Sequence, residues 1–406
     1  MKRSLYPLIE CLLVLALVTG LLFVTSRLVE NKASYNKYNE FYKYGDEYEV
    51  LFSGSSHMMN MALPMELWKK YGIRSYNIGN GAETIPVTYH VIRNALDHSS
   101  PKVIVMDVFY AYSDQTVSDS TSEMAHAFFD EVPFSFHKAE AICDIFEDAQ
   151  ERWNYLFDFS IYHSRWNELT KADLFPEDAG LGGASILLES YAPAGTQTDP
   201  PELHEMARVP REYLMKIKEL CDEKGIRLVC VMNPYPMWQE KRTCNVDFEK
   251  EMNEMGIEFI DLRESDAVDI YADSADNMHL NLCGERKIND VYGEYLTGIG
   301  CGGDHDPSDE IWKGRYEAYI RKKAMYLSGC DECVQLLTDL NDPDMVYDIT
   351  VGEDAALTDT MRRMLKNAKD YENVSIATAD VPDGDIRIRV RIRGADRDLV
   401  DKSFDL

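Results

Sequence analysis

Short apolar runs of strand length recur through the first part of the chain, and segments of helical character separate them. The runs cover residues 48–53, 74–78, 102–109, 226–232 and 257–262. Apolar strands that alternate with helices are typical of a parallel sheet that is covered by helices on both faces. The pattern therefore predicts an α/β domain with three layers, α/β/α, over residues 31–300.

A glycine-rich stretch at residues 298–307 marks a change of composition and the expected end of that domain. The chain has 406 residues, which is more than one average domain needs. Beyond the stretch, the pattern predicts helices at 310–327 and 356–369, a strand at 345–351 and two further strands. We therefore expect a small α/β accessory domain over residues 301–406.

The last predicted strand, residues 385–394, alternates Ile or Val with Arg. In a strand this alternation places the apolar side chains on one face and the Arg side chains on the other. The apolar face is expected to pack on a core. For the Arg face, solvation or pairing with neighbouring side chains is favoured over the alternative, which is the binding of an anionic polymer.

The chain carries 71 acidic and 42 basic side chains, which corresponds to a formal net charge of −29. Such a charge argues against nucleic acid and anionic membrane surfaces as partners of the folded body. Its main consequence is a soluble surface that repels copies of itself.

Nine cysteines are scattered along the chain, and their odd number excludes complete pairing within it. Cys330 and Cys333 form a lone CxxC without a second pair or a neighbouring His. This indicates a chance pair or a single local disulfide in preference to a metal or redox centre. We expect neither a metal nor a cofactor.

The N-terminal segment, residues 5–26, is strongly apolar and follows Lys2 and Arg3. A bilayer is spanned by about 20 apolar residues. The basic amino end and the length of the polar remainder favour a single-pass signal anchor over residues 1–30, with the bulk of the chain outside the cytoplasm. A cleaved secretory signal is the alternative.

Two short motifs carry the chemistry. Gly54-Ser55-Ser56-His57 follows the first predicted strand, and Asp276-x-x-His279 follows the last one. The carboxyl ends of parallel strands meet at one edge of a sheet, where sites usually lie. A nucleophilic Ser needs a base, and the base needs a carboxylate that holds its tautomer, so the motifs predict a triad of Ser56, His279 and Asp276. The alternative is that the Ser turn only caps a helix.

These two motifs resemble the first and last motif blocks of the SGNH (GDSL-like) hydrolase superfamily, whose three-layer fold is flavodoxin-like. The N-terminal anchor and the Gly-Ser-Ser-His turn are similar to cell-surface proteins that act beside membrane-bound O-acyltransferases. Those proteins include the D-alanyl transfer protein of teichoic acid and the alginate O-acetylation proteins. The resemblance implies that Ser56 is the nucleophile, His279 the base and Asp276 its partner.

Residues 76–83 resemble the second block of the superfamily, whose Gly donates a backbone N–H to the oxyanion. Counted from the motif, that place falls on Ala82, with Gly81 adjacent, and the Ser56 N–H at the start of a helix is a further donor. A plain glycine turn is the alternative. The candidates for the wall of the site are His57, Asn80 and Asn233.

The third block of true hydrolases, Gly-x-Asn-Asp after a central strand, is absent, because that strand ends Met106-Asp107. Loss of the Asn removes one oxyanion donor and favours a specialised transferase or a degraded site over a general esterase. Residues 178–205 form a long stretch without periodicity, which indicates a lid, a binding loop or disorder.

The residues and the resemblance together lead to one hypothesis and two alternatives. The hypothesis is transfer of an acyl group, acetyl above all, to a cell-envelope polysaccharide or teichoic-acid-like polymer, with a membrane-bound O-acyltransferase as partner. The alternatives are a carbohydrate esterase with the same triad and a non-catalytic scaffold subunit of an envelope-modifying complex.

Overall fold

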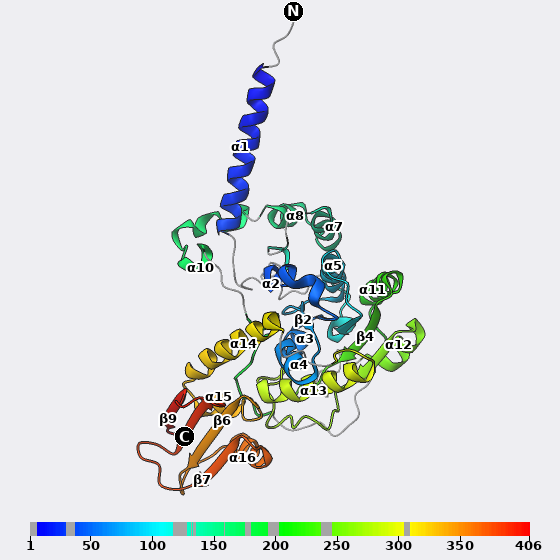
Figure 1. Cartoon of the computed structure of the whole chain (residues 1–406). Coiled ribbons are helices and arrows are strands. Elements are labelled where there is room, and N and C mark those ends of the chain that lie inside the picture. Colours follow the sequence, from blue (N-terminus) through cyan, green and yellow to red (C-terminus); the bar gives the residue numbers. More distant parts are fainter. Residues whose placement is uncertain are drawn as a thin grey trace, which may run out of the picture.

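Five parallel strands form the central sheet of the protein. The computed structural model describes residues 6–29, 37–116, 128–130, 132, 135–157, 159–174, 180–193, 203–236, 246–303 and 309–406. Within these residues the sheet has the order β2-β1-β3-β4-β5, with every neighbouring pair parallel (Figure 1). Its strands are β1 (Val50–Ser53), β2 (Ser75–Asn77), β3 (Val103–Asp107), β4 (Arg227–Met232) and β5 (Glu258–Asp261). The predicted parallel sheet is confirmed, and each strand is somewhat shorter than its apolar run.

Helices cover both faces of this sheet, because alternate strand residues point to opposite sides. On one face Val50 and Phe52 pack against α3 (Ser56–Met61), α4 (Pro64–Tyr71) and α13 (Leu282–Gly298). On the other face Leu51 and Ile104 pack in a core with α5 (Ile85–Ala95), α11 (Arg208–Lys224) and α12 (Phe248–Met255). The strands β1, β2 and β3 are therefore buried on both sides, as their composition predicts, whereas the edge strand β5 is partly exposed.

Shorter elements complete this part of the chain. They are α2 (Lys37–Tyr44), η1 (Gly45–Glu47), η2 (Phe109–Tyr112) and a group of helices that follows η2. We call that group the cap layer and define it as residues 136–157 and 159–174, with the helices α7 (Phe136–Ile145), α8 (Ala149–Leu156), α9 (Phe159–Tyr162), η3 (His163–Asn167) and α10 (Lys171–Leu174). In Figure 1 the cap layer lies at the end of the body from which α1 emerges.

A second sheet of four strands follows in the C-terminal part, in the order β7-β6-β8-β9. Only β6 and β7 run parallel. The elements are α14 (Glu310–Ser328), α15 (Cys333–Leu337), β6 (Met345–Val351), α16 (Asp359–Asn367), η5 (Ala368–Asp370), β7 (Val374–Thr378), β8 (Ile386–Ile392) and β9 (Val400–Phe404). Strand β9 was not predicted, because between Val400 and Phe404 it has the polar run Asp-Lys-Ser and lacks apolar alternation.

The alternating strand β8 has the two faces that its sequence predicts. Its Ile and Val side chains are buried in the core of the second sheet. On the opposite face Arg387 contacts Asp401 of β9 at 2.7 Å, and Arg389 lies 3.5 Å from Asp348 of β6. Pairing with acidic side chains of the adjacent strands thus occupies this part of the Arg row.

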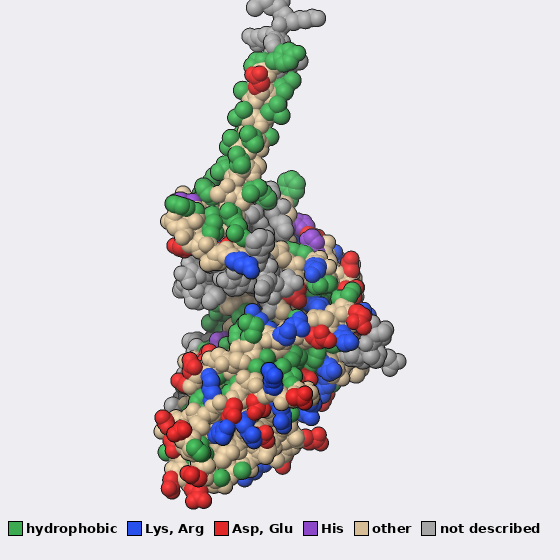
Figure 2. Space-filling view, turned by 60° about the vertical axis from the view of Figure 1, so that its left-hand side comes forward, with side chains coloured by type: hydrophobic (Ala, Val, Ile, Leu, Met, Phe, Trp, Pro, Cys, Tyr) green, Lys and Arg blue, Asp and Glu red, His purple; other side chains and the backbone are tan. Residues whose placement is uncertain are grey.

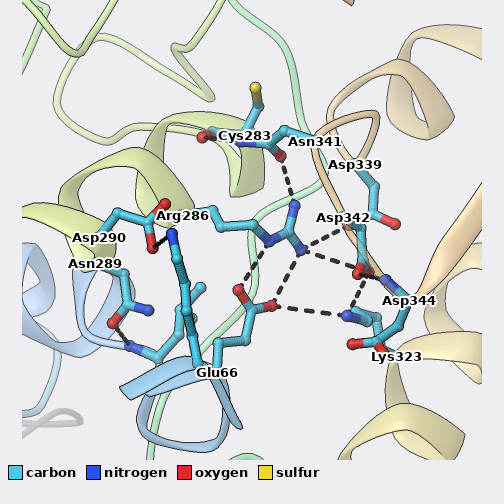
Figure 3. A network of polar contacts seen from close by, with 12 residues as sticks. Glu66, Cys283, Arg286, Asn289, Asp290, Lys323, Asp339, Asn341, Asp342 and Asp344 are labelled. Carbon is cyan, nitrogen blue, oxygen red and sulfur yellow. Dashed lines mark hydrogen bonds and ion pairs between the residues drawn. The ribbon is translucent and has the colours of Figure 1, made fainter. Parts of the chain in front are cut away.

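A buried cluster of charged side chains joins the two sheet systems, and we call it the junction cluster (Figure 3). Arg286 of α13 contacts Glu66 of α4 at 2.8 Å and Asp339 at 2.9 Å. Lys323 of α14 contacts Asp342 and lies 3.6 Å from Glu66. The five side chains come from α4, α13, α14 and the segment between α15 and β6, so they connect the part of the chain with the first sheet to the part with the second.

Helix α1 (Tyr6–Val29) extends away from the body (Figure 1). Its stretch Ile9–Ser26 is long and apolar enough to cross a membrane, and none of that stretch is buried inside the protein. Figure 2 shows the helix clad in hydrophobic side chains, in contrast to the mixed charges of the lower body. This matches the apolar segment predicted at residues 5–26 as a candidate for a single-pass anchor, and the side on which the body lies stays a prediction.

Candidate active site

The Ser turn follows β1 directly, at the carboxyl edge of the sheet. Gly54 has a φ of 129°, and a Cβ placed on it would come within 2.2 Å of Asp107 Oδ2. Ser55 is the N-cap of α3, and its Oγ accepts a hydrogen bond from the His57 N–H at 3.3 Å. Ser56 is the first residue of the helix. The capping role, the alternative to catalysis, therefore belongs to Ser55 and leaves Ser56 for another task.

Asp107, the last residue of β3, forms hydrogen bonds with the Ser turn. Its carboxylate accepts hydrogen bonds from the Ser55 N–H at 2.5 Å, the Ser55 Oγ at 3.1 Å and the Phe109 N–H at 3.0 Å. Burial raises the pKa of Asp107 to about 6, although these hydrogen bonds act to lower it. The residue at the end of the central strand thus accepts hydrogen bonds, whereas the Asn of the hydrolase block would donate one.

The second motif lies in the loop between β5 and α13. Asp276 Oδ1 accepts hydrogen bonds from the N–H groups of Met278 at 2.6 Å and His279 at 2.8 Å, which closes a tight turn. Burial opposes ionisation of Asp276, but the hydrogen bonds from His279 and from the Met278 N–H outweigh it and lower its pKa to about 2. Asp276 is therefore an ionised acceptor over the whole ordinary pH range.

The structure brings Ser56, His279 and Asp276 together. The Nε2 atom of His279 lies 2.8 Å from Ser56 Oγ, and the Nδ1 atom lies 2.8 Å from Asp276 Oδ2. When Nδ1 carries the proton that is donated to Asp276, Nε2 is the basic nitrogen and faces the Ser56 hydroxyl. The three side chains are partly or fully exposed, so a substrate can reach them.

The segment 180–193, part of the predicted lid or binding loop, contacts helix α3 and the loop that carries Asp276 and His279. The Ser185 N–H donates to the Met59 carbonyl of α3 at 3.0 Å, and the Tyr191 N–H donates to the Ser274 carbonyl at 2.9 Å. The Gly182 carbonyl accepts from the Asn77 N–H at the end of β2 at 3.0 Å. We call these residues the strap, because they tie the helix of Ser56 to the loop of His279.

Two of the predicted wall residues lie at the base of the site. The His57 ring is buried and stacks on Phe109 with ring centroids 4.2 Å apart, and it lies 5.3 Å from the His279 ring. Asn233, at the end of β4, donates from Nδ2 to the His57 carbonyl at 3.3 Å and accepts from the Tyr292 hydroxyl. Asn233 thus supports the backbone of α3 from the adjacent strand.

The third predicted wall residue, Asn80, makes its hydrogen bonds with other parts of the protein. Its N–H donates to the Gly54 carbonyl at 2.9 Å, which aligns the second loop with the Ser turn. Its Nδ2 donates to the Tyr38 hydroxyl at 2.7 Å and to Glu83 at 2.6 Å. Burial raises the pKa of Glu83 to about 8, although the hydrogen bonds from Asn80 and Thr88 act to lower it. The side chain of Asn80 is therefore a poor replacement for the missing oxyanion donor.

Gly81 and Ala82 form the turn after Asn80. Ala82 has a φ of 52°, in the left-handed region where residues other than Gly are uncommon. Such strain is often kept at functional sites, which agrees with a special task for this turn. Donation to an oxyanion by the N–H groups of Ser56, Gly81 and Ala82 stays a prediction.

Asp107 was not assigned to the site from the sequence. A carboxylate at the end of an otherwise apolar strand, one place along the sheet from the Ser turn, is a signal that could have identified it. The strap lies within the stretch predicted as a lid, a binding loop or disorder, but its individual contacts could not be predicted, because backbone groups make them. Cys330 and Cys333 are free thiols, which answers the question of a local disulfide. Within the described part of the chain, no group of three or more His, Cys, Asp or Glu side chains could hold a metal ion.

No family model matches the sequence, and no curated protein matches it either. The chain is an α/β protein with Ser, His and Asp side chains gathered at the carboxyl edge of a parallel sheet. In a comparison with solved structures, 27 chains match it. They include a protein described as an acylhydrolase from Bacteroides fragilis, with 11% identity, 62% of this chain and 86% of that chain covered and a TM-score of 0.32. An acetylxylan esterase from Geobacillus stearothermophilus has 11% identity, 63% and 95% coverage and a TM-score of 0.32. At these TM-scores the functional argument rests on the geometry of the site alone.

Proposed function

We propose that the protein is a serine acyltransferase that works on a cell-envelope polymer outside the cytoplasm. The observation that carries this proposal is the chain of two 2.8 Å contacts from Ser56 Oγ through His279 to Asp276. A Ser hydroxyl becomes a nucleophile when a base accepts its proton, and a carboxylate behind the base keeps the required tautomer and stabilises the imidazolium.

The reaction has two steps. In the first, Ser56 Oγ attacks the carbonyl carbon of an acyl ester, the bond to the leaving oxygen breaks, and His279 passes the Ser56 proton to that oxygen. In the second, a hydroxyl of the acceptor glycan attacks the Ser56 ester while His279 takes the hydroxyl proton and returns it to Ser56 Oγ. Acetyl is the acyl group we favour, and no metal or cofactor takes part in either step.

Transfer to a glycan is favoured over hydrolysis by Asp107. A general esterase of this arrangement would use an Asn side chain after the central strand as an oxyanion donor. Asp107 accepts hydrogen bonds there and stabilises the Ser turn instead. A site with one fewer donor is suited to an activated acyl donor handed over by a partner, for which we propose a membrane-bound O-acyltransferase.

The apolar helix α1 supports a location at the membrane, where such a partner resides. An anchored enzyme samples only a thin layer next to the bilayer, which raises the effective concentration of a membrane partner. The envelope polymer then receives the acyl group on the same side as the body.

Labelling of the full-length chain with a fluorophosphonate tests the proposal. We expect the label on Ser56, and we expect Ser56→Ala and His279→Ala to abolish labelling while Ser55→Ala retains it. Absence of label from folded wild-type protein contradicts a nucleophilic Ser56. Incubation with an acetyl donor, with and without an acceptor glycan, then distinguishes transfer from hydrolysis, because an esterase releases acetate at the same rate in both.

The scaffold alternative makes a different prediction in cells. If the triad has no catalytic role, Ser56→Ala and His279→Ala leave the acylation of the envelope unchanged, whereas deletion of residues 302–406 abolishes it.

A further inference from the structure

The cap layer presents large apolar side chains to solvent. Phe136 is 93% exposed, Trp153 53%, Phe157 50%, Trp166 68% and Leu174 56%. Outside α1, the exposed Phe and Trp side chains of the described residues all belong to this layer. Scattered single apolar residues are normal on a surface, but a concentration of aromatic side chains on one layer marks an interaction site.

This layer is built onto the base of α1. Val29, the last residue of α1, is buried against the body, and its carbonyl accepts a hydrogen bond from Arg165 Nη1 of η3 at 2.8 Å. Arg165 is itself held by Asp173 of α10 at 3.0 Å. Helix α1 also packs against α9 and α10. The helix and the cap layer therefore form one continuous unit, without a free linker between the described end of α1 and the cap.

The geometry of α1 gives the distance of the cap layer from the end of the apolar stretch. The apolar stretch ends at Ser26, three residues before Val29, and an α-helix rises about 1.5 Å per residue. The cap layer consequently begins about 5 Å beyond the apolar stretch, which is the level of the lipid headgroups. Figure 1 shows α7, α8 and α10 near the height of the base of α1, and Figure 2 shows charged side chains gathered on the lower part of the body.

We propose that the cap layer is a second membrane contact, with Trp153, Phe157 and Trp166 inserted into the interface of the phospholipid bilayer that α1 spans. Trp is enriched at this level of a membrane, and short amphipathic helices bind there by burying their apolar side chains. The charge of −29 excludes attraction to anionic lipids as the driving force. The contact is therefore apolar, forms on zwitterionic lipid and changes little with salt.

Such a contact would orient the body. A single helix leaves a domain free to tilt about its base, whereas a second contact next to it restricts that tilt. The Ser56 site would then stay at a constant height and angle above the bilayer. The inference depends on α1 as a membrane span and is independent of the proposed acyl transfer.

The test uses the fluorescence of tryptophan in the full-length chain, reconstituted into phosphatidylcholine vesicles with or without bromine atoms on the acyl chains. All variants carry Trp238→Phe, so that the remaining reporters are Trp68, Trp153, Trp166 and Trp312. We expect quenching by bromine, stronger when the bromines lie near the headgroups than near the chain ends. The double variant Trp153→Phe/Trp166→Phe should lose most of the quenching, because Trp68 and Trp312 are buried in the protein. The matched control Trp68→Phe should keep it.

A second set of variants tests the apolar contact itself. Phe157→Ser/Trp166→Ser should shift the emission of Trp153 to longer wavelength and reduce its quenching. Met325→Ser, which removes an exposed apolar side chain from α14, should leave both unchanged. Circular dichroism shows whether each variant is folded.

Flotation of the vesicles separates the two ways in which the inference can fail. If the full-length chain does not float with the vesicles, α1 is not an anchor and the inference falls with it. If the chain floats and Trp153 and Trp166 are not quenched, only the lipid contact of the cap layer is overturned. The exposed side chains would then indicate a contact with a protein partner.

Discussion

The candidate active site and the junction cluster are two groups of polar side chains with opposite designs. The site gathers side chains from the start of α3 and from the loop before α13 at a partly open edge, where the Asp276 side chain is 51% exposed. The junction cluster gathers five side chains from packed helices and the segment after α15, and Asp339 and Asp342 are fully buried. Exposure admits a substrate and exchanges protons with water, whereas burial removes water and leaves only the internal partners.

The charges of the two regions are balanced in different ways. In the junction cluster three carboxylates, Glu66, Asp339 and Asp342, face two cations, Arg286 and Lys323. The hydroxyls of Tyr319 and Tyr347 donate hydrogen bonds at 2.6 Å to Glu66 and Asp339, respectively, and so stabilise part of the excess negative charge. A buried cluster of this kind needs all its members, because removal of one leaves another charge without compensation. The site, by contrast, is expected to remain folded when it loses a member, because its side chains are partly exposed. This difference leads to four predictions.

The largest effect is expected for Ser56→Ala at the site. Loss of the nucleophile should lower the rate of acyl transfer by about 10³- to 10⁶-fold with little change in the midpoint of thermal unfolding. Ser55→Ala is the matched control, and it should lower stability by about 1 kcal/mol through loss of the N-cap. A Ser56→Ala protein that keeps the wild-type rate contradicts the assignment of the nucleophile.

The junction cluster should show the reverse pattern. Arg286→Ala removes the cation that contacts Asp339 and leaves Glu66 with only Lys323 at 3.6 Å, and it should lower the free energy of unfolding by about 3–5 kcal/mol. Urea denaturation measures this change. Arg387→Ala breaks an exposed pair with Asp401 and should leave the urea midpoint almost unchanged, because solvent screens that pair. Equal effects of the two substitutions would show that burial does not distinguish the pairs.

The strap gives an intermediate effect that links packing to the site. Gly183 has a φ of 82°, and a Cβ there would lie 2.0 Å from the Asn77 carbonyl oxygen. Gly183→Ala should therefore displace the strap, lower stability by about 2–3 kcal/mol and reduce activity more than a change in stability alone explains. Gly225→Ala is the control, because Gly225 has a φ of 69° and nothing within 4 Å of the added Cβ. Unfolding curves measure the loss of stability, and reaction rates measured below the unfolding transition measure the loss of activity, so the two effects can be separated.

The last prediction concerns the dependence of stability on pH, which has opposite signs in the two regions. Burial and the adjacent Asp342 carboxylate raise the pKa of Asp339 to about 7. The folded state then binds a proton that the unfolded chain releases, so the contribution of Asp339 to stability increases as pH falls from about 7 to about 4. The difference in unfolding free energy between wild type and Asp339→Asn should grow in favour of wild type over this range.

Asp276 behaves in the other direction. Its pKa is lowered to about 2, so its contribution is present above about pH 4 and is lost as pH falls toward 2. The advantage of wild type over Asp276→Asn should therefore shrink as pH falls from about 4 toward 2. A pH-independent difference for Asp339→Asn, or one for Asp276→Asn that grows as pH falls below about 4, would contradict this contrast.

Much of the fold could be predicted because local patterns decide it. The five apolar runs predicted the strands of the parallel sheet, and the stretch that ends at Ser26 predicted α1. In the strand β8, alternation predicted which side chains are buried. The prediction failed at β9, where pairing with β8 overrides a polar sequence, since the ladder forms through backbone groups that any residue carries.

The candidate site could be predicted only as a set of residue types. Ser56, His279 and Asp276 were identified from their motifs, and the fold brings their side chains within hydrogen-bonding distance. The resemblance assigned the nucleophile to Ser56, whereas the capping role of Ser55 became visible only in the fold. The direction in which each points depends on Asp107, which belongs to another strand.

The sequence by itself determined the elements of this protein, the class of its main sheet, its apolar helix and the residue types available for chemistry. These follow from hydrophobic period, length and turn residues, which act over a few positions of the chain. The tertiary structure alone decided that Asp107 supports the Ser turn, that the strap joins the two motifs and that five charges bury together at the junction. Those contacts join residues far apart in the chain, so they depend on how the layers pack and on how the strands are ordered.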